Sequence, residues 1–188
     1  MAYFPMFIDF NDKKILVVGG GNIASEKLEK LVEFTKEITV ITKELNSTSQ
    51  QLIKEHCLTL WQRPYKKGDI EGFDIVIVAA NSIALQKAIY QESRSRHILV
   101  NSVDNTDYCD FIFPSYIKRG DLTIAFSTSG ASPAFAKHLR RYFETIIPQG
   151  VEEFLAELKN LRTKLPKGKE RMAYFEERVS SYFKEKFH

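Results

Sequence analysis

Short apolar runs alternate with segments of helical periodicity along the chain up to about Asn105. The apolar runs are rich in Ile, Val and Leu and predict strands at 14–18, 37–41, 58–62, 75–79 and 98–100. Between them, the spacing of apolar residues predicts helices at 23–33, 46–56 and 84–93. Strands joined through helices pair in parallel with right-handed crossovers, so this alternation predicts a doubly wound α/β sheet with the order 3-2-1-4-5.

The pattern changes after Cys109. Two further runs, 111–118 and 121–127, are separated only by Arg119-Gly120. A connection this short favours an antiparallel hairpin, which we expect to lie outside the main sheet.

Helices are predicted for the rest of the chain. Ser132 is a good N-cap and Pro133 suits a first helical position, while amphipathic segments from Val151 onward flank the break at 166–168. A small hairpin with one helix cannot bury both of its faces, so the sequence predicts either a homodimer formed through this region or packing onto the same chain's sheet.

A glycine motif lies where the first predicted strand gives way to a helix. It reads Gly19-x-Gly21-x-x-Ala24. Glycines let backbone N–H groups approach a pyrophosphate, and the third small residue lets the helix pack closely on the strand. A glycine turn without a ligand is the alternative, but the strand before it and the helix after it favour a Rossmann-type dinucleotide site.

The acidic residue that often holds the ribose of NAD is missing after the second predicted strand, which ends at Thr42-Lys43-Glu44. Either Glu44 or Thr42 together with backbone groups must therefore hold the ribose. Lys43 leaves NADP open, since a cation could meet a 2′-phosphate, and a solvated lysine is the alternative.

Composition excludes several classes of function. The 188 residues are 44% apolar with a net charge of +3, which does not indicate nucleic-acid binding, although basic residues gather at 118–119, 137–141 and after Arg162. The two cysteines are far apart and have no metal-ligand spacing, so neither a zinc site nor a disulfide framework is expected. No signal segment or apolar run of membrane-spanning length is present, so we expect a cytoplasmic protein without membrane contact.

Several segments, taken in order, resemble the precorrin-2 dehydrogenase family, which includes the amino-terminal module of bacterial sirohaem synthase. The resemblance covers essentially the whole chain. It rests on Phe4-Pro5-Met6-Phe7, on Val17-Val18-Gly19-Gly20-Gly21-Asn22-Ile23-Ala24 with Lys27, on Asn101-Ser102-Val103-Asp104, on Cys109-Asp110-Phe111-Ile112-Phe113-Pro114-Ser115, and on Ser127-Thr128-Ser129-Gly130-Ala131-Ser132-Pro133.

The resemblance implies NAD-dependent oxidation of precorrin-2 to sirohydrochlorin by a homodimer. It also implies an amino-terminal NAD-binding Rossmann domain, expected at 1–110, an α+β dimerisation region at 111–148 and a helical carboxyl-terminal domain at 149–188. It leaves open whether ferrous iron is then inserted to give sirohaem, and whether iron or cobalt is the metal of the pathway. No methyltransferase module follows before His188, so a short stand-alone form is expected. Some members carry a phosphorylatable serine where Thr128 stands here, which puts such regulation in doubt.

The same resemblance assigns roles to individual residues. The catalytic aspartate falls on Asp104, whose ionised carboxylate could act as a base near the nicotinamide; a capping residue is the alternative. Cofactor contacts are expected at Gly19, Gly21, Asn22, Ile23, Thr42, Lys43, Glu44, Ala80 and Asn81. The many carboxylates of a tetrapyrrole favour cations and free N–H groups, which predicts substrate contacts at Ser129, Ser132, Lys137, His138 and Arg141, with a solvated helix face as the alternative for the cations.

Two other classes of protein are alternatives to a dehydrogenase. A non-catalytic NAD-sensing module would bind NAD without turnover, and a methyltransferase has a similar glycine loop but favours an acid at the end of the second strand.

Overall fold

The computed structural model describes residues 3–103 and 105–187 and divides into two compact units, Phe4–Ile112 and a second that consists of Tyr3 and the chain from Phe113 onward. The catalytic prediction at Asp104 lies outside the described residues. Among the described residues, no helix is long and apolar enough to cross a membrane.

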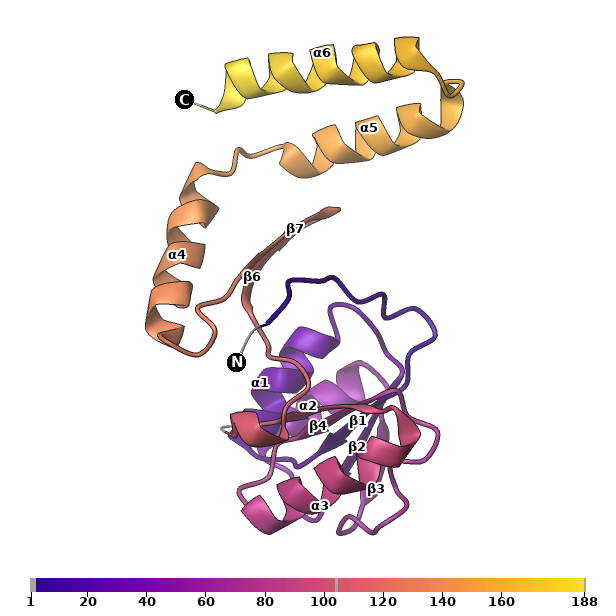
Figure 1. Cartoon of the computed structure of the whole chain (residues 1–188), viewed down its shortest axis with the longest axis vertical. Coiled ribbons are helices and arrows are strands. Elements are labelled where there is room, and N and C mark those ends of the chain that lie inside the picture. Colours follow the sequence, from indigo (N-terminus) through magenta and orange to yellow (C-terminus); the bar gives the residue numbers. More distant parts are fainter. Residues whose placement is uncertain (1–2, 104, 188) are drawn as a thin grey trace. The chain divides into compact units, whose positions relative to one another are not determined.

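The first unit contains a parallel sheet with helices on both faces (Figure 1). Its elements are β1 (Ile15–Val18), α1 (Asn22–Leu31), β2 (Ile38–Thr42), α2 (Ser47–Glu55), β3 (Thr59–Gln62), β4 (Ile75–Val78), α3 (Ile83–Ser93) and β5 (Leu99–Ser102), with short 3-10 turns at Arg94–Arg96 and Thr106–Tyr108. The strand order β3-β2-β1-β4-β5 confirms the predicted topology. The Rossmann-type α/β prediction is therefore correct.

The central strands are hydrophobic throughout because both faces of the sheet are covered. Every residue of β1 and of β4 is buried, and in the register Val18 pairs with Ile41 on one side and Val78 on the other. The strands β1, β2 and β4 therefore end level with one another. The loops that follow them meet at one edge, which is where ligands bind in this class of fold.

The second unit begins with an antiparallel hairpin of β6 (Ser115–Arg119) and β7 (Leu122–Phe126). It continues with α4 (Pro133–Ile146), α5 (Val151–Lys164) and α6 (Lys169–Lys186). Ile117, Ile147 and Val151 form its small core. The predicted Ser132 cap is confirmed, since its hydroxyl accepts a hydrogen bond from the Phe135 N–H at 3.1 Å.

The hairpin differs from its prediction in where it starts. The first strand begins at Ser115 rather than at 111, directly after Pro114, which has no N–H to donate to a ladder. The tight turn uses Gly120 and Asp121, and Gly120 has a φ of 55°, a conformation that favours glycine.

Candidate cofactor site

The turn after β1 passes directly against the end of β4. The Gly19 N–H donates to the Ile41 carbonyl at 2.8 Å, and Gly19 has a φ of +133°. A Cβ at this position would lie 2.3 Å from the Ala79 carbonyl oxygen. Glycine is therefore required at position 19 both by the backbone angle and by the space available.

The turn also passes against the loop that follows β2. A Cβ at Gly20 would lie 2.4 Å from the Glu44 carbonyl oxygen and 2.8 Å from the Thr42 methyl carbon. The Gly20 carbonyl in turn accepts a hydrogen bond from the Asn46 N–H at 2.9 Å. Sequence reasoning assigned no role to Gly20, although the run of three glycines was a signal that all three positions are constrained.

Gly21 differs from its two neighbours because its missing side chain faces open space. No atom lies within 4 Å of where its Cβ would be, and its φ of −85° is open to any residue. Gly21 is the N-cap of α1, and no side chain caps that end of the helix. Free N–H groups beside empty space fit the pyrophosphate of a dinucleotide. The residues present therefore fit NAD at this turn.

The loop after β2 holds itself in place with its own polar groups. The Thr42 hydroxyl donates to the Glu44 carbonyl at 2.7 Å, while the side chains of Lys43 and Glu44 are exposed. Thr42 thus shapes the loop through its side chain. Lys43 and Glu44 lie at the edge of the sheet where the ribose of the cofactor would approach. Their contacts with the cofactor remain predictions.

Asn46 connects the glycine turn to the second loop and was missed at the sequence level. Its amide nitrogen donates to the Asn22 side-chain oxygen at 2.9 Å, and its own side-chain oxygen accepts from the Ser49 N–H at 2.7 Å as the N-cap of α2. The predicted contact Asn22 is therefore held by Asn46. A cap residue at the start of the second predicted helix was the available signal.

The remaining predicted cofactor contacts lie at the same sheet edge. Ile23 follows Asn22 in the first turn of α1, and Ala80 and Asn81 follow β4. The Ala80 carbonyl accepts a hydrogen bond from the Gln86 side chain at 2.9 Å. The structure thus brings the predicted cofactor residues to the carboxyl ends of β1, β2 and β4.

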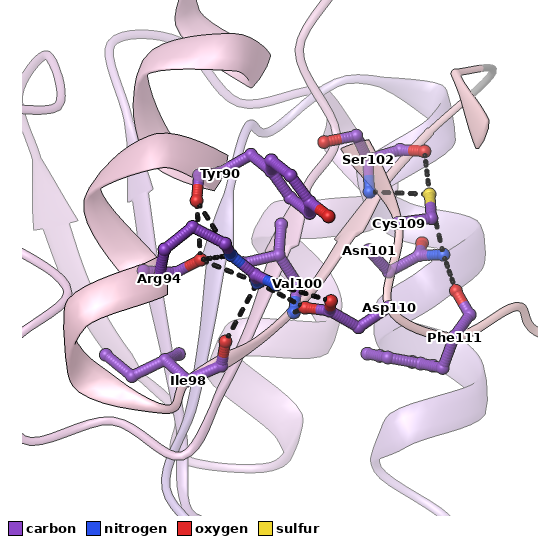
Figure 2. A network of polar contacts seen from close by, with 10 residues as sticks. Tyr90, Arg94, Ile98, Val100, Asn101, Ser102, Cys109, Asp110 and Phe111 are labelled. Atoms are coloured by element: carbon purple, nitrogen blue, oxygen red, sulfur yellow. Dashed lines mark hydrogen bonds and ion pairs between the residues drawn. The ribbon is translucent and has the colours of Figure 1, made fainter. Parts of the chain in front are cut away.

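Cys109 closes the loop that follows β5. Its sulfur accepts from the Ser102 N–H at 3.2 Å and lies 3.0 Å from the Ser102 carbonyl (Figure 2). It also lies 3.2 Å from the Asn105 carbonyl, so these two carbonyls are the acceptors for its thiol. Burial raises the pKa of the Cys109 thiol, which keeps the proton on sulfur. In this structure, Cys109 has the role of a structural hydrogen-bonding group.

Asp110 fixes the same loop to the beginning of β5 (Figure 2). Its carboxylate accepts from the Val100 N–H at 2.8 Å and from both terminal nitrogens of Arg94 at 2.8 and 2.6 Å. The hydrogen bonds to Asp110 raise the pKa of Arg94, whose guanidinium also lies 4.0 Å from the centre of the Tyr90 ring. This network holds the end of the loop after β5 against the beginning of that strand. The sequence does not predict it, because its residues come together only in the folded structure.

The predicted substrate contacts all lie in the second unit. Ser132 caps α4, and Ser129 precedes it with a φ of 52°. The basic residues Lys137, His138 and Arg141 are exposed along α4. Arg140, the fourth base of this group, differs from them because it is paired with Glu144.

The fold and the glycine turn define an α/β dinucleotide-binding domain. Residues 6–115 match the family model described as putative NAD(P)-binding, and residues 119–145 match the one described as sirohaem biosynthesis protein central. Because the first match covers more than half of the chain, the chain belongs to this NAD(P)-binding family, and the predicted family resemblance is confirmed. The match also supports NAD as the cofactor.

Individual relatives agree with this placement. Siroheme synthase of Zymomonas mobilis is 32% identical over 191 residues, covering 99% of this chain and 40% of the relative. Siroheme synthase of Pseudoalteromonas atlantica is 38% identical over 151 residues, covering 80% of this chain and 33% of the relative. The chain thus spans well under half the length of these curated relatives.

A solved structure is similar along nearly the whole chain. The protein described as SirC, precorrin-2 dehydrogenase, superposes with a TM-score of 0.76 at 25% identity, covering 90% of this chain and 85% of that one. The similarity therefore includes both units and is not confined to the nucleotide-binding sheet.

Proposed function

We propose that this chain catalyses the NAD-dependent oxidation of precorrin-2 to sirohydrochlorin. The observation that carries the proposal is the similarity to a precorrin-2 dehydrogenase over 90% of the chain. An open, uncapped glycine turn at Gly21 supports it independently, because such a turn suits a dinucleotide.

The chemistry divides between the cofactor and the chain. Bound NAD⁺ provides a hydride acceptor at its nicotinamide ring. Oxidation moves a hydride from the macrocycle to NAD⁺, which becomes NADH, and leaves a proton to be taken up by a base. We assign that base to Asp104, and we assign the cofactor contacts to the predicted residues at the ends of β1, β2 and β4.

The assay mixes precorrin-2 with NAD⁺ and follows NADH absorbance in wild type, Asp104→Ala and Asp107→Ala. Asp107 is the matched control, since it is an exposed aspartate in the same stretch of chain. Loss of a general base lowers kcat by about 100-fold or more. We therefore expect Asp104→Ala to lose that much kcat with NAD⁺ affinity unchanged, and Asp107→Ala to stay near wild type.

Two outcomes would contradict parts of this proposal, and a third would extend it. Wild-type protein that binds NAD⁺ but produces no NADH would favour the NAD-sensing module. Full activity in Asp104→Ala would remove Asp104 from the catalytic role. Formation of sirohaem from sirohydrochlorin and ferrous iron without NAD⁺, above the spontaneous rate, would add ferrochelatase activity to the dehydrogenase.

We assign recognition of the substrate carboxylates to the turn at Ser129 and Ser132 and to the exposed cations of α4. Charge-assisted hydrogen bonds to carboxylates contribute more than neutral ones, so Lys137→Ala and Arg141→Ala should raise KM for precorrin-2. Lys164→Ala, an exposed lysine on α5, is the control. An unchanged KM in both α4 variants would refute this assignment.

We also propose a homodimer formed through residues 111–148, with residues 149–188 as a helical domain. Phe135, Tyr142 and Ile146 are 60%, 61% and 43% exposed, and their spacing places them on one face of α4. A second copy would remove this apolar surface from water. Sedimentation should give a dimer that Tyr142→Glu weakens; a wild-type monomer at micromolar concentration would refute the proposal.

A further inference from the structure

Gln86 is a buried polar residue at the ligand-binding edge of the sheet. It lies near the start of α3 and is 4% exposed. Its side-chain nitrogen donates to the Ala80 carbonyl at 2.9 Å and to the Val103 carbonyl at 3.3 Å. One amide group therefore joins the loop after β4 to the loop after β5.

The two loops joined in this way have different roles in the proposed reaction. Ala80 is an assigned cofactor contact, and Val103 directly precedes Asp104 in the chain. The Val103 N–H is also bonded, to the Val78 carbonyl at 3.0 Å, so the backbone of Val103 is held on both sides. Hydrogen bonds of this kind hold the backbone at the start of the loop after β5.

We propose that Gln86 is a positioning residue that holds the loop after β4, at Ala80, and the start of the loop after β5, at Val103, at a fixed separation. The inference rests on the proposed function. Gln86 acts through the backbone of Ala80 and Val103, so it is not itself a catalytic residue. The two hydrogen bonds that the Gln86 side-chain nitrogen donates compensate the cost of removing that nitrogen from water, whereas the Gln86 side-chain oxygen is buried without a hydrogen-bond partner among the described residues.

The alternative is that Gln86 only stabilises the fold. A variant of a second buried residue of α3, Ser93, serves as the control that distinguishes positioning from stabilisation. Ser93 is fully buried at the opposite end of α3, where its hydroxyl donates to the Tyr90 carbonyl at 2.8 Å and accepts from the Arg94 guanidinium at 2.9 and 3.2 Å. Ser93→Ala therefore removes buried hydrogen bonds at the end of α3 away from the cofactor edge, while Arg94 keeps its ion pair with Asp110. Gln86→Met removes the amide and keeps the length of the side chain.

The experiment compares wild type, Gln86→Met and Ser93→Ala by thermal midpoint, NAD⁺ affinity and steady-state kinetics with precorrin-2. We expect both variants to lower the midpoint, but only Gln86→Met to lower kcat, by about 10-fold or more, while KM for precorrin-2 stays within about twofold of wild type. The dissociation constant for NAD⁺ should rise in Gln86→Met alone, because only that variant frees the Ala80 loop.

Equal kcat values in Gln86→Met and Ser93→Ala would overturn the positioning role. If Gln86→Met does not fold, Gln86→Asn takes its place, because it stays neutral and is one methylene shorter, so its amide is withdrawn from the Ala80 and Val103 carbonyls. If wild type oxidises no precorrin-2, the proposed function fails, and the NAD⁺ titration still tests whether Gln86 holds the cofactor loop.

Discussion

Replacing Gly19 and replacing Gly21, two glycines of the same turn, should impair different properties of the protein. In Gly19→Ala the new methyl group would lie 2.3 Å from the Ala79 carbonyl oxygen, in a backbone conformation with a φ of +133°. In Gly21→Val the new side chain meets no atom within 4 Å of its Cβ. We therefore expect the first variant to lose stability and the second to lose cofactor binding.

The size of the first effect follows from strain and overlap. An unfavourable backbone angle costs about 1–3 kcal/mol, and forcing extra volume into packed structure costs about 1–3 kcal/mol more. Each kcal/mol lowers the thermal midpoint of a chain of this size by about 2–4 °C. Gly19→Ala should therefore unfold roughly 5–20 °C below wild type.

Gly21→Val should change stability by no more than about 1 kcal/mol, because its extended backbone suits a β-branched residue. The valine occupies space that the pyrophosphate needs. Losing one or two hydrogen bonds to the charged phosphates costs about 2–4 kcal/mol, which raises Kd by about 30-fold to 1000-fold.

The assay is a calorimetric NAD⁺ titration combined with a thermal melt. Gly168→Val is the control, because Gly168 is also an N-cap glycine with no atom within 4 Å of its Cβ, on α6. It should bind NAD⁺ like wild type. The reasoning is refuted if Gly21→Val binds NAD⁺ within about threefold of wild type, or if Gly19→Ala melts at the wild-type temperature.

Three further predictions concern the groups that hold the first unit together. Asp110→Ala removes the acceptor of an ion pair and of a β5 amide, so the thermal midpoint should fall by about 3–10 °C; a midpoint within 1 °C of wild type would contradict this role. Burial keeps the pKa of Cys109 raised, so iodoacetamide at neutral pH should label exposed Cys57 in the folded protein and Cys109 only after unfolding, as peptide mass spectrometry would show. The hydrogen bond from Arg63 lowers the pKa of Asp69 below its ordinary 3.8, so the stability gained from this ionisation is present above that value and lost as the pH falls through the lowered pKa. Melts of wild type and Asp69→Asn should accordingly converge in acid, and a constant difference from neutral to acid pH would disprove the linkage.

The sequence by itself determined the order of elements, the sheet topology and the position of the cofactor turn. These features are local or periodic. Buried parallel strands read as continuous aliphatic runs such as Ile15–Val18, and a glycine motif between strand and helix has few other uses. Crossover handedness then leaves few possible strand orders.

Only the tertiary structure decided which residues hold the site together. Gln86 joins loops that follow two different strands, Asn46 reaches back to the glycine turn, and Asp110 is paired with Arg94 from a preceding helix. The contacts of Gln86 with Val103, of Asn46 with Asn22 and of Asp110 with Arg94 each link positions at least 16 residues apart. Neither residue type nor spacing predicts such pairs, because hydrogen-bond partners depend on how elements distant in sequence are brought together in space.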